Sequence, residues 1–188
     1  MHLLNSGFSL IESLICIIVF LIIVMSTSLP GVSSWRKNAE IDNVMHELMS
    51  VISMARAHAI AENVFVTLCR SDDGEHCQGN WNEGFILFTD HDANRVINGS
   101  DRILSRSKNM SSLGLISYNS FQNKQYLMIT PRGFTDFQNG NFTFCSADGD
   151  PKRNRQIIVS LSGRARYARD RDGDGVVENS QGRPVTCL

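Results

Sequence analysis

The sequence predicts an α+β fold, in which one long N-terminal helix packs on an antiparallel β-sheet head. Two changes along the chain indicate it. Residues 8–63 consist of an apolar run followed by a helical stripe, and after Asn63 short β-rich runs alternate with Gly, Asn, Asp and Ser. The length of 188 residues allows one domain with its own core. We therefore expect helical segments at 8–29 and 30–63 and a globular head at 64–188.

The apolar run at residues 8–29 would form a helix about 33 Å long, which is the thickness of a bilayer core. We expect it to be a single-pass transmembrane helix. A signal peptide would begin with basic residues, and no Lys or Arg precedes this run. Glu12 is the one charged residue inside it, and since a carboxylate is costly in hydrocarbon it is a predicted functional residue.

The segment at 30–63 begins with Pro30-Gly31, which predicts a kink or a local break in the helix. Apolar residues then recur at helical spacing and form one stripe. We expect this stripe to pack on the sheet. Its members are Ile41, Val44, Met45, Leu48, Val51, Ile52, Ala55 and Ala59.

The remainder of the chain has the pattern of short strands separated by turns. Pro131-Arg132-Gly133 indicates a turn, and Ser162-Gly163 joins the last two predicted strands as a hairpin. The predicted strands are 64–70, 84–89, 113–118, 126–130, 141–145, 156–161 and 164–168.

Four of the five cysteines lie beyond the apolar run, and Cys16 lies within it, where a thiol acts as a small hydrophobe. An even number of cysteines in this part indicates two disulfides and an oxidising compartment. Cys69 with Cys77 would close a small polar loop, and Cys145 with Cys187 would attach the C-terminal tail to a strand. A zinc site is the alternative, but closely spaced ligand pairs are absent.

The formal net charge of −1 gives no global attraction for nucleic acid, but residues 152–171 hold seven basic residues and one acid, Asp170. A hairpin would place Arg164 and Arg166 on one face. The basic residues Lys152, Arg153 and Arg155 would lie nearby. Such a surface suits phosphate groups and binds less tightly as salt rises. The alternatives are a solvated arginine face or an acidic protein partner.

A second candidate site is an acidic stretch, in which Asp170, Asp172 and Asp174 precede Gly175. This spacing matches the opening of a calcium loop, although position twelve is Gln181 rather than a bidentate Glu. A solvated acidic turn is the alternative, and we assign no other cofactor. Residues 90–94 have the same spacing of oxygen-bearing side chains but lack the glycine, and they are predicted to form a polar turn.

The sequence predicts no enzyme. The five histidines are scattered over the N-terminus, the helix and the loops, and His46 and His58 are expected on the helix surface. No nucleophile has a recognisable turn around it, and no glycine loop for phosphate is present.

The residues Gly7-Phe8-Ser9-Leu10-Ile11-Glu12 resemble the processing site of type IV prepilins and pseudopilins. The resemblance implies that residues 1–7 are a leader and that a prepilin peptidase cuts after Gly7 and methylates Phe8. It also implies that Glu12 pairs with the N-terminal amine of a neighbouring pilin in a filament. The protein would then sit in the bacterial inner membrane with its head in the periplasm, exposed on the pilus after assembly.

The head resembles the GspH/FimT minor pseudopilins in several motifs. They are Cys69, residues 81–90, Pro131-Arg132-Gly133, residues 142–145 and Ser162-Gly163-Arg164.

Gly163-Arg164-Ala165-Arg166 also resembles the Gly-Arg-x-Arg signature of FimT pseudopilins that bind DNA. The resemblance implies non-specific binding of double-stranded DNA by Arg164 and Arg166 in natural transformation, with Gly163 forming the turn. Lys152, Arg153 and Arg155 would assist. The alternatives are a GspH-like pseudopilin of type II secretion, an assembly-priming minor pilin, or a secreted calcium-dependent module.

Overall fold

The structure is a computed structural model that describes residues 9–108 and 112–187, with side chains omitted for 26–33. Helix α1 spans Leu10–Glu62. Its backbone is helical through Pro30 and Gly31, so the local break expected there is not found. The chain forms two compact units, Met1–Asn38 and Ala39–Leu188.

The first unit contains the predicted membrane segment. Among the residues that the structure describes, no helix is long and apolar enough to cross a membrane. The predicted span at 8–29 includes Phe8 and the side chains of 26–29, which lie outside the described part, as does Gly7.

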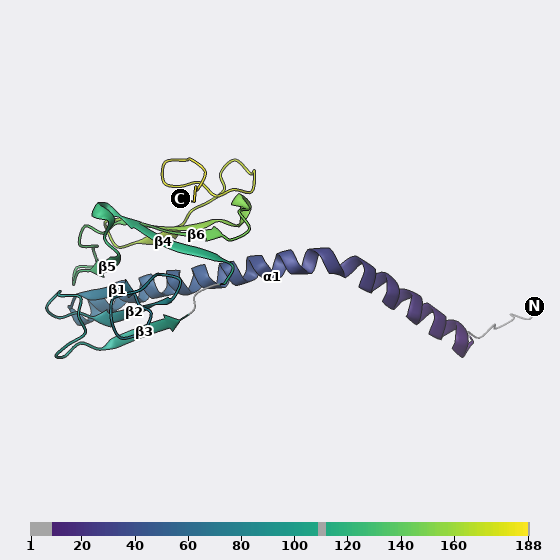
Figure 1. The fold of residues 1–188 in the computed structure, drawn as a ribbon, viewed down its shortest axis with the longest axis horizontal. Coiled ribbons are helices and arrows are strands. Elements are labelled where there is room, and N and C mark those ends of the chain that lie inside the picture. The colour runs from purple at the N-terminus through teal and green to yellow at the C-terminus, as the bar shows by residue number, and fades with distance from the viewer. Residues whose placement is uncertain (1–8, 109–111, 188) are drawn as a thin grey trace, which may run out of the picture. The chain divides into compact units, whose positions relative to one another are not determined.

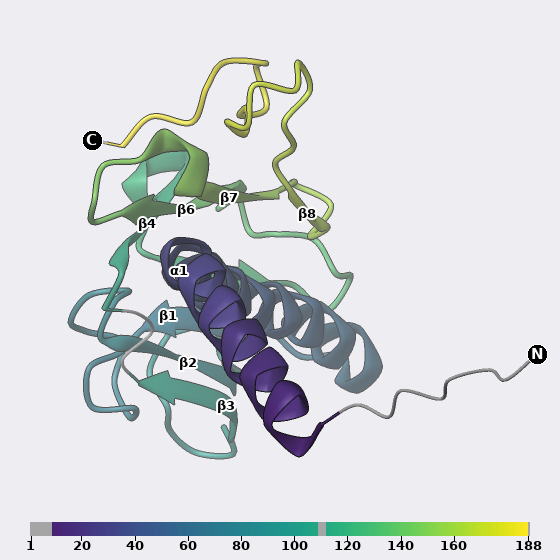
Figure 2. The same ribbon diagram turned by 90° about the vertical axis from the view of Figure 1, so that its right-hand side faces the viewer.

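The second unit holds two four-stranded antiparallel sheets, with strand orders β3-β2-β1-β5 (Figure 1) and β4-β6-β7-β8 (Figure 2). The prediction of one sheet was therefore wrong, because β4 pairs with β6 rather than with the strand that follows it. The strands are β1 (Val66–Arg70), β2 (Gly84–Thr89), β3 (Ile103–Lys108), β4 (Gly114–Ser120), β5 (Tyr126–Ile129), β6 (Gly140–Ser146), β7 (Arg155–Val159) and β8 (Ala165–Tyr167).

Strand β3 was not predicted. After Ile103 and Leu104 it continues with Ser105, Arg106, Ser107 and Lys108, so it lacks an apolar alternation. It forms the edge of its sheet and pairs only with β2, and an edge strand can be polar because one side of it faces solvent.

The apolar stripe of α1 forms the centre of the core. All eight predicted members are buried, and they share one cluster with Leu68 and Phe85 from the first sheet and Phe142 and Ile157 from the second. Figure 2 shows this part of the helix with β4, β6 and β7 on one side and β1, β2 and β3 on the other. Both sheets therefore bury their inner faces against the same helix.

The outer face of the first sheet carries a smaller cluster of Cys69, Ile86 and Phe88. Ile97, from the loop between β2 and β3, packs over it. Because β2 is covered on both faces, all of its residues are buried, unlike those of an alternating strand.

Both predicted disulfides are confirmed. Cys69 is bonded to Cys77 and Cys145 to Cys187. The second bond attaches the C-terminal tail, yellow in Figure 1, to the side of β4 and β6 that faces away from α1.

The core predicts a clear difference between two isoleucines of α1. Ile52→Ala should lower the free energy of unfolding by about 2–5 kcal/mol, because Ile52 is 0% exposed between the sheets. Ile60→Ala is the matched control: Ile60 is 45% exposed and should cost about 1 kcal/mol or less. Urea unfolding of residues 34–188 measures both, since every buried member of the main core lies at or beyond Ile41. Equal losses would contradict this description of the core.

Candidate functional site

The hairpin of β7 and β8 presents two arginines on its outer face. Arg166 lies opposite Ile158 in the register, and the Ser160 amide donates to the Arg164 carbonyl oxygen at 2.9 Å. Side chains alternate along a strand, so Arg164 and Arg166 lie on the same face. Both are exposed, and within the described residues neither forms an ion pair.

Gly163 holds this hairpin turn against a second turn. Its φ is +70°, and a Cβ there would lie 2.2 Å from the carbonyl oxygen of Gly133. Only glycine allows this conformation and this approach without strain. Arg56 of α1 also donates from Nε to the same Gly133 oxygen at 3.2 Å. The turn at 130–133 and the turn at 160–163 are therefore packed together beside the end of α1.

This contact adds basic residues that the sequence analysis missed. Arg132 is exposed beside Gly133, and Arg56 is half-buried beneath it. The signal was present in Pro131-Arg132-Gly133, which was interpreted only as a turn. We call the residues around this contact, namely Arg56, Ile60, 130–137 and 160–164, the two-turn corner.

The remaining predicted basic residues are held at the other end of β7. Arg155 lies opposite Phe144 on the inner face, and its Nε contacts Asp42 of α1 at 2.9 Å. Arg153 forms an ion pair with Asp148. The pKa of Asp148 lies below its usual value, because the Ser146 hydroxyl and the Asp150 amide donate to it and Arg153 is adjacent.

Lys152 is exposed, and its aliphatic carbons lie over Gly175, where a Cβ would come within 3.3 Å of Lys152 Cδ. It therefore lies beside the acidic loop. The expectation that Lys152, Arg153 and Arg155 support Arg164 and Arg166 as one cluster does not match this placement, since each has acidic residues nearby.

A groove of 1040 Å³ lies between the C-terminal tail and the outer face of β4, β6 and β7. Carboxamides and hydroxyls dominate its lining, and Arg70 and Glu83 are its only charged residues among those described. It therefore offers little attraction for phosphate groups. The carboxamides that line it are Asn80, Asn82, Asn119, Asn123, Gln125, Asn141, Gln156, Asn179 and Gln181.

The acidic loop brings the three predicted aspartates together. Carboxylate oxygens of Asp170, Asp172, Asp174 and Glu178 lie within 4.8 Å of one another. The amides of Gly173 and Gly175 donate to Asp170 and hold its pKa below the ordinary value. These are oxygen ligands of the type that calcium takes. Calcium binding here stays a prediction.

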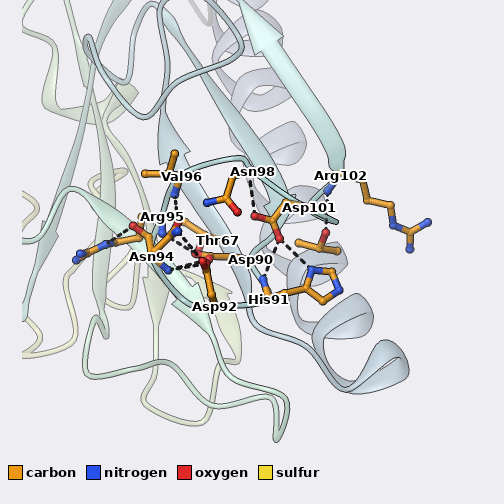
Figure 3. Close-up of polar contacts among 11 residues, drawn as sticks. Thr67, Asp90, His91, Asp92, Asn94, Arg95, Val96, Asn98, Asp101 and Arg102 are labelled. Carbon is orange, nitrogen blue, oxygen red and sulfur yellow. Dashed lines mark hydrogen bonds and ion pairs between the residues drawn. The ribbon is translucent and has the colours of Figure 1, made fainter.

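A second acidic loop surrounds Asp90, which is fully buried at the end of β2 (Figure 3). Asp90 accepts hydrogen bonds from the Thr67 hydroxyl at 2.8 Å and from the amides of Asn94 and Arg95 at 2.9 and 3.0 Å. Burial raises its pKa despite these donors. The polar turn predicted for residues 90–94 is confirmed, but its first residue is a buried anchor.

The other end of this loop is fixed by Asp101, which accepts from the amides of His91 and Asn98 (Figure 3). Oxygens of Asp90, Asp92 and Asp101 lie within 4.8 Å of one another. Between these anchors the loop carries Ile97 onto the outer cluster of the first sheet. The structural role of the loop is therefore to cover this sheet.

Comparison with known proteins places the chain in a family. A model of the type II transport protein GspH family matches residues 45–163, which is more than half of the chain. The chain belongs to the GspH family. The match begins within α1 and ends at Gly163, so Arg164 and Arg166 lie just beyond it. The resemblance to GspH recognised from the sequence is confirmed.

The fold of this GspH family member is that of pilin-like proteins. The crystal structure of the type IV minor pilin FimU of Pseudomonas aeruginosa matches with a TM-score of 0.57 and 15% identity, covering 82% of this chain and 99% of FimU. A second crystal form of FimU matches with a TM-score of 0.51 and 15% identity, covering 68% and 92%. The predicted α+β pilin-like fold is thus confirmed.

The minor pseudopilin EpsH from the Type 2 Secretion System of Vibrio cholerae gives a TM-score of 0.49 and 8% identity, over 68% of this chain and 95% of EpsH. Among curated proteins no sequence matches.

The packing of the two turns predicts a specific cost for Gly163→Ala. The left-handed backbone costs about 1–2 kcal/mol with a Cβ, and the overlap with the Gly133 oxygen adds about 1–3 kcal/mol. Gly149→Ala is the matched control, because Gly149 has φ +73° but nothing within 4 Å of an added Cβ. Chemical unfolding should show the larger loss for Gly163→Ala. Equal losses would mean that the turns are not in contact.

The Asp90 anchor predicts a large effect for Asp90→Ala. The variant leaves the Thr67 hydroxyl and two amides without their acceptor and should cost about 2–4 kcal/mol of unfolding free energy. Asp92→Ala, an exposed carboxylate in the same loop, should cost about 1 kcal/mol or less. Thermal and urea unfolding measure both variants. A small loss for Asp90→Ala would show that the loop is not fixed by this residue.

Proposed function

We propose that the chain is a minor pseudopilin of a type IV pilus that binds double-stranded DNA non-specifically for uptake in natural transformation. The observation that carries the proposal is the pair Arg164 and Arg166. Both are exposed on one face of a hairpin, and Gly163 fixes that hairpin against the next turn.

Membership of the GspH family and the fold shared with FimU support the role as a pilin subunit. The apolar side chains of residues 10–25 are exposed in the single chain. A surface of that kind needs a membrane or neighbouring helices to cover it. We propose inner-membrane insertion of this segment, cleavage after Gly7, methylation of Phe8 by the prepilin peptidase, and assembly through Glu12.

The proposed DNA contact is electrostatic. Guanidinium groups bind phosphate oxygens in a bidentate manner, and such contacts do not depend on base sequence. Within the described residues neither Arg164 nor Arg166 forms an ion pair, so no such pair has to be broken before they contact phosphate. Arg132, on the two-turn corner, adds a third positive charge nearby. Retraction of the pilus would then draw the held DNA inward.

The alternatives are a GspH-like minor pseudopilin of type II secretion and an assembly-priming minor pilin. Family membership supports these roles as well. In both, the exposed arginines would face acidic side chains of a neighbouring subunit instead of DNA. The DNA-uptake role requires the isolated head to bind DNA, whereas the secretion and assembly roles do not.

DNA binding can be measured with residues 34–188, disulfides intact, and a short fluorescent duplex at about 50 and about 200 mM salt. We expect salt-sensitive binding. Arg164→Ala/Arg166→Ala should weaken it strongly and reduce the slope of log affinity against log salt by about 2.

The matched control is Arg106→Ala/Lys108→Ala, which removes the same charge from alternate exposed positions of β3 in the other sheet. It should leave most of the affinity. If both double variants lose the same affinity for the duplex, the attraction comes from the general charge of the head rather than from Arg164 and Arg166. Absence of binding at the lower salt would rule out the DNA role and leave the assembly or secretion role.

A further inference from the structure

The two-turn corner exposes large apolar side chains next to its arginines. Ile60, Phe134 and Leu161 are 45%, 50% and 50% exposed. They surround Gly133: a Cβ on Gly133 would lie 2.7 Å from Ile60 Cδ1, Phe134 follows it in the chain, and the Leu161 carbonyl accepts from the Thr135 amide at 2.9 Å. The three apolar side chains therefore come from the segments that meet at the contact between the two turns.

A fourth apolar side chain, Phe137, is 65% exposed and has φ +58°, a conformation that bulky residues avoid. Its neighbours fix it there. The Asp136 amide donates to the Met128 carbonyl, and the buried Gln138 accepts from the Met128 amide through Oε1. Strain of this kind persists where the surrounding structure imposes it, and it holds Phe137 outward.

The two-turn corner carries more positive than negative charge. Its basic residues are Arg56, Arg132 and Arg164, and its one acid is Asp136, which accepts from Gln138 Nε2 at 3.5 Å. A duplex offers phosphates to such a surface but keeps its base faces stacked inside. A single strand offers both phosphates and unpaired bases, and base-on-aromatic stacking is independent of sequence.

We propose that the two-turn corner binds DNA with unpaired bases, such as single strands and frayed ends. Phe134 and Phe137 stack on bases, and Arg132 and Arg164 contact the flanking phosphates. This inference rests on the proposed DNA-binding function and adds contacts to unpaired bases to the phosphate contacts proposed there.

The experiment compares three ligands of equal length with residues 34–188: a single strand, a duplex, and an abasic single strand. We expect the single strand to bind about tenfold more tightly than the abasic strand, because stacking is worth about 1–3 kcal/mol per base. Phe134→Ala should weaken single-strand binding by about tenfold and change binding of the duplex and of the abasic strand by less than about twofold.

Leu115→Ala is the matched control, since Leu115 is an exposed apolar residue near the start of β4 and outside the corner. It should leave all three affinities unchanged. Circular dichroism confirms that each variant is folded. Equal binding of the base-containing and abasic strands, or no effect of Phe134→Ala, would overturn the inference.

The inference and the proposed function fail differently. Suppose that Arg164→Ala/Arg166→Ala abolishes duplex binding and Phe134→Ala has no effect on single-strand binding. This result overturns the base contact and keeps the electrostatic DNA site. No binding to any of the three ligands overturns both. The corner would then be a contact for an acidic protein neighbour.

Discussion

Burial of the α1 stripe between two sheets is the interaction on which the rest of the head depends. Each sheet has an apolar inner face. The same helix covers both inner faces and keeps them from solvent. Burying the apolar side chains of these faces removes apolar surface from water, and this burial stabilises the fold. Among the residues that the structure describes, the loop at 90–102 and the turns at 130–133 and 160–163 each start or end beside a strand of these sheets.

The two-turn corner shows how a small steric detail can place functional side chains. Gly163 and Gly133 lie 30 residues apart in the sequence, yet the backbone of one touches the carbonyl of the other. Because a glycine is needed for both the positive φ and the close approach, the turn that precedes Arg164 has little freedom. Arg164 and Arg132 are thereby presented from two different parts of the chain on one surface.

Arginines of the same short segment have different roles. Arg155 begins β7 on its inner face and contacts Asp42 of the helix, whereas Arg166 lies on the outer face of the partner strand. Arg153 is engaged by Asp148. A count of charges along the chain therefore overstates the basic surface that can attract a polyanion. The alternation of side chains along β7 turns Arg155 toward the helix, and nearby acids pair with Arg155 and Arg153.

The sequence by itself determined the long helix, the identity of its buried stripe, most of the strands, the number of disulfides and the family, since these depend on local periodicity, cysteine number and contiguous motifs. The structure decided which cysteines pair. It missed β3, whose polar edge lacks a periodic signal, and it merged two sheets into one. Only the tertiary structure decided which basic residues lie together and which acids neutralise them. The physical reason is that strand pairing and turn packing join residues distant in the chain, and no local pattern records those contacts.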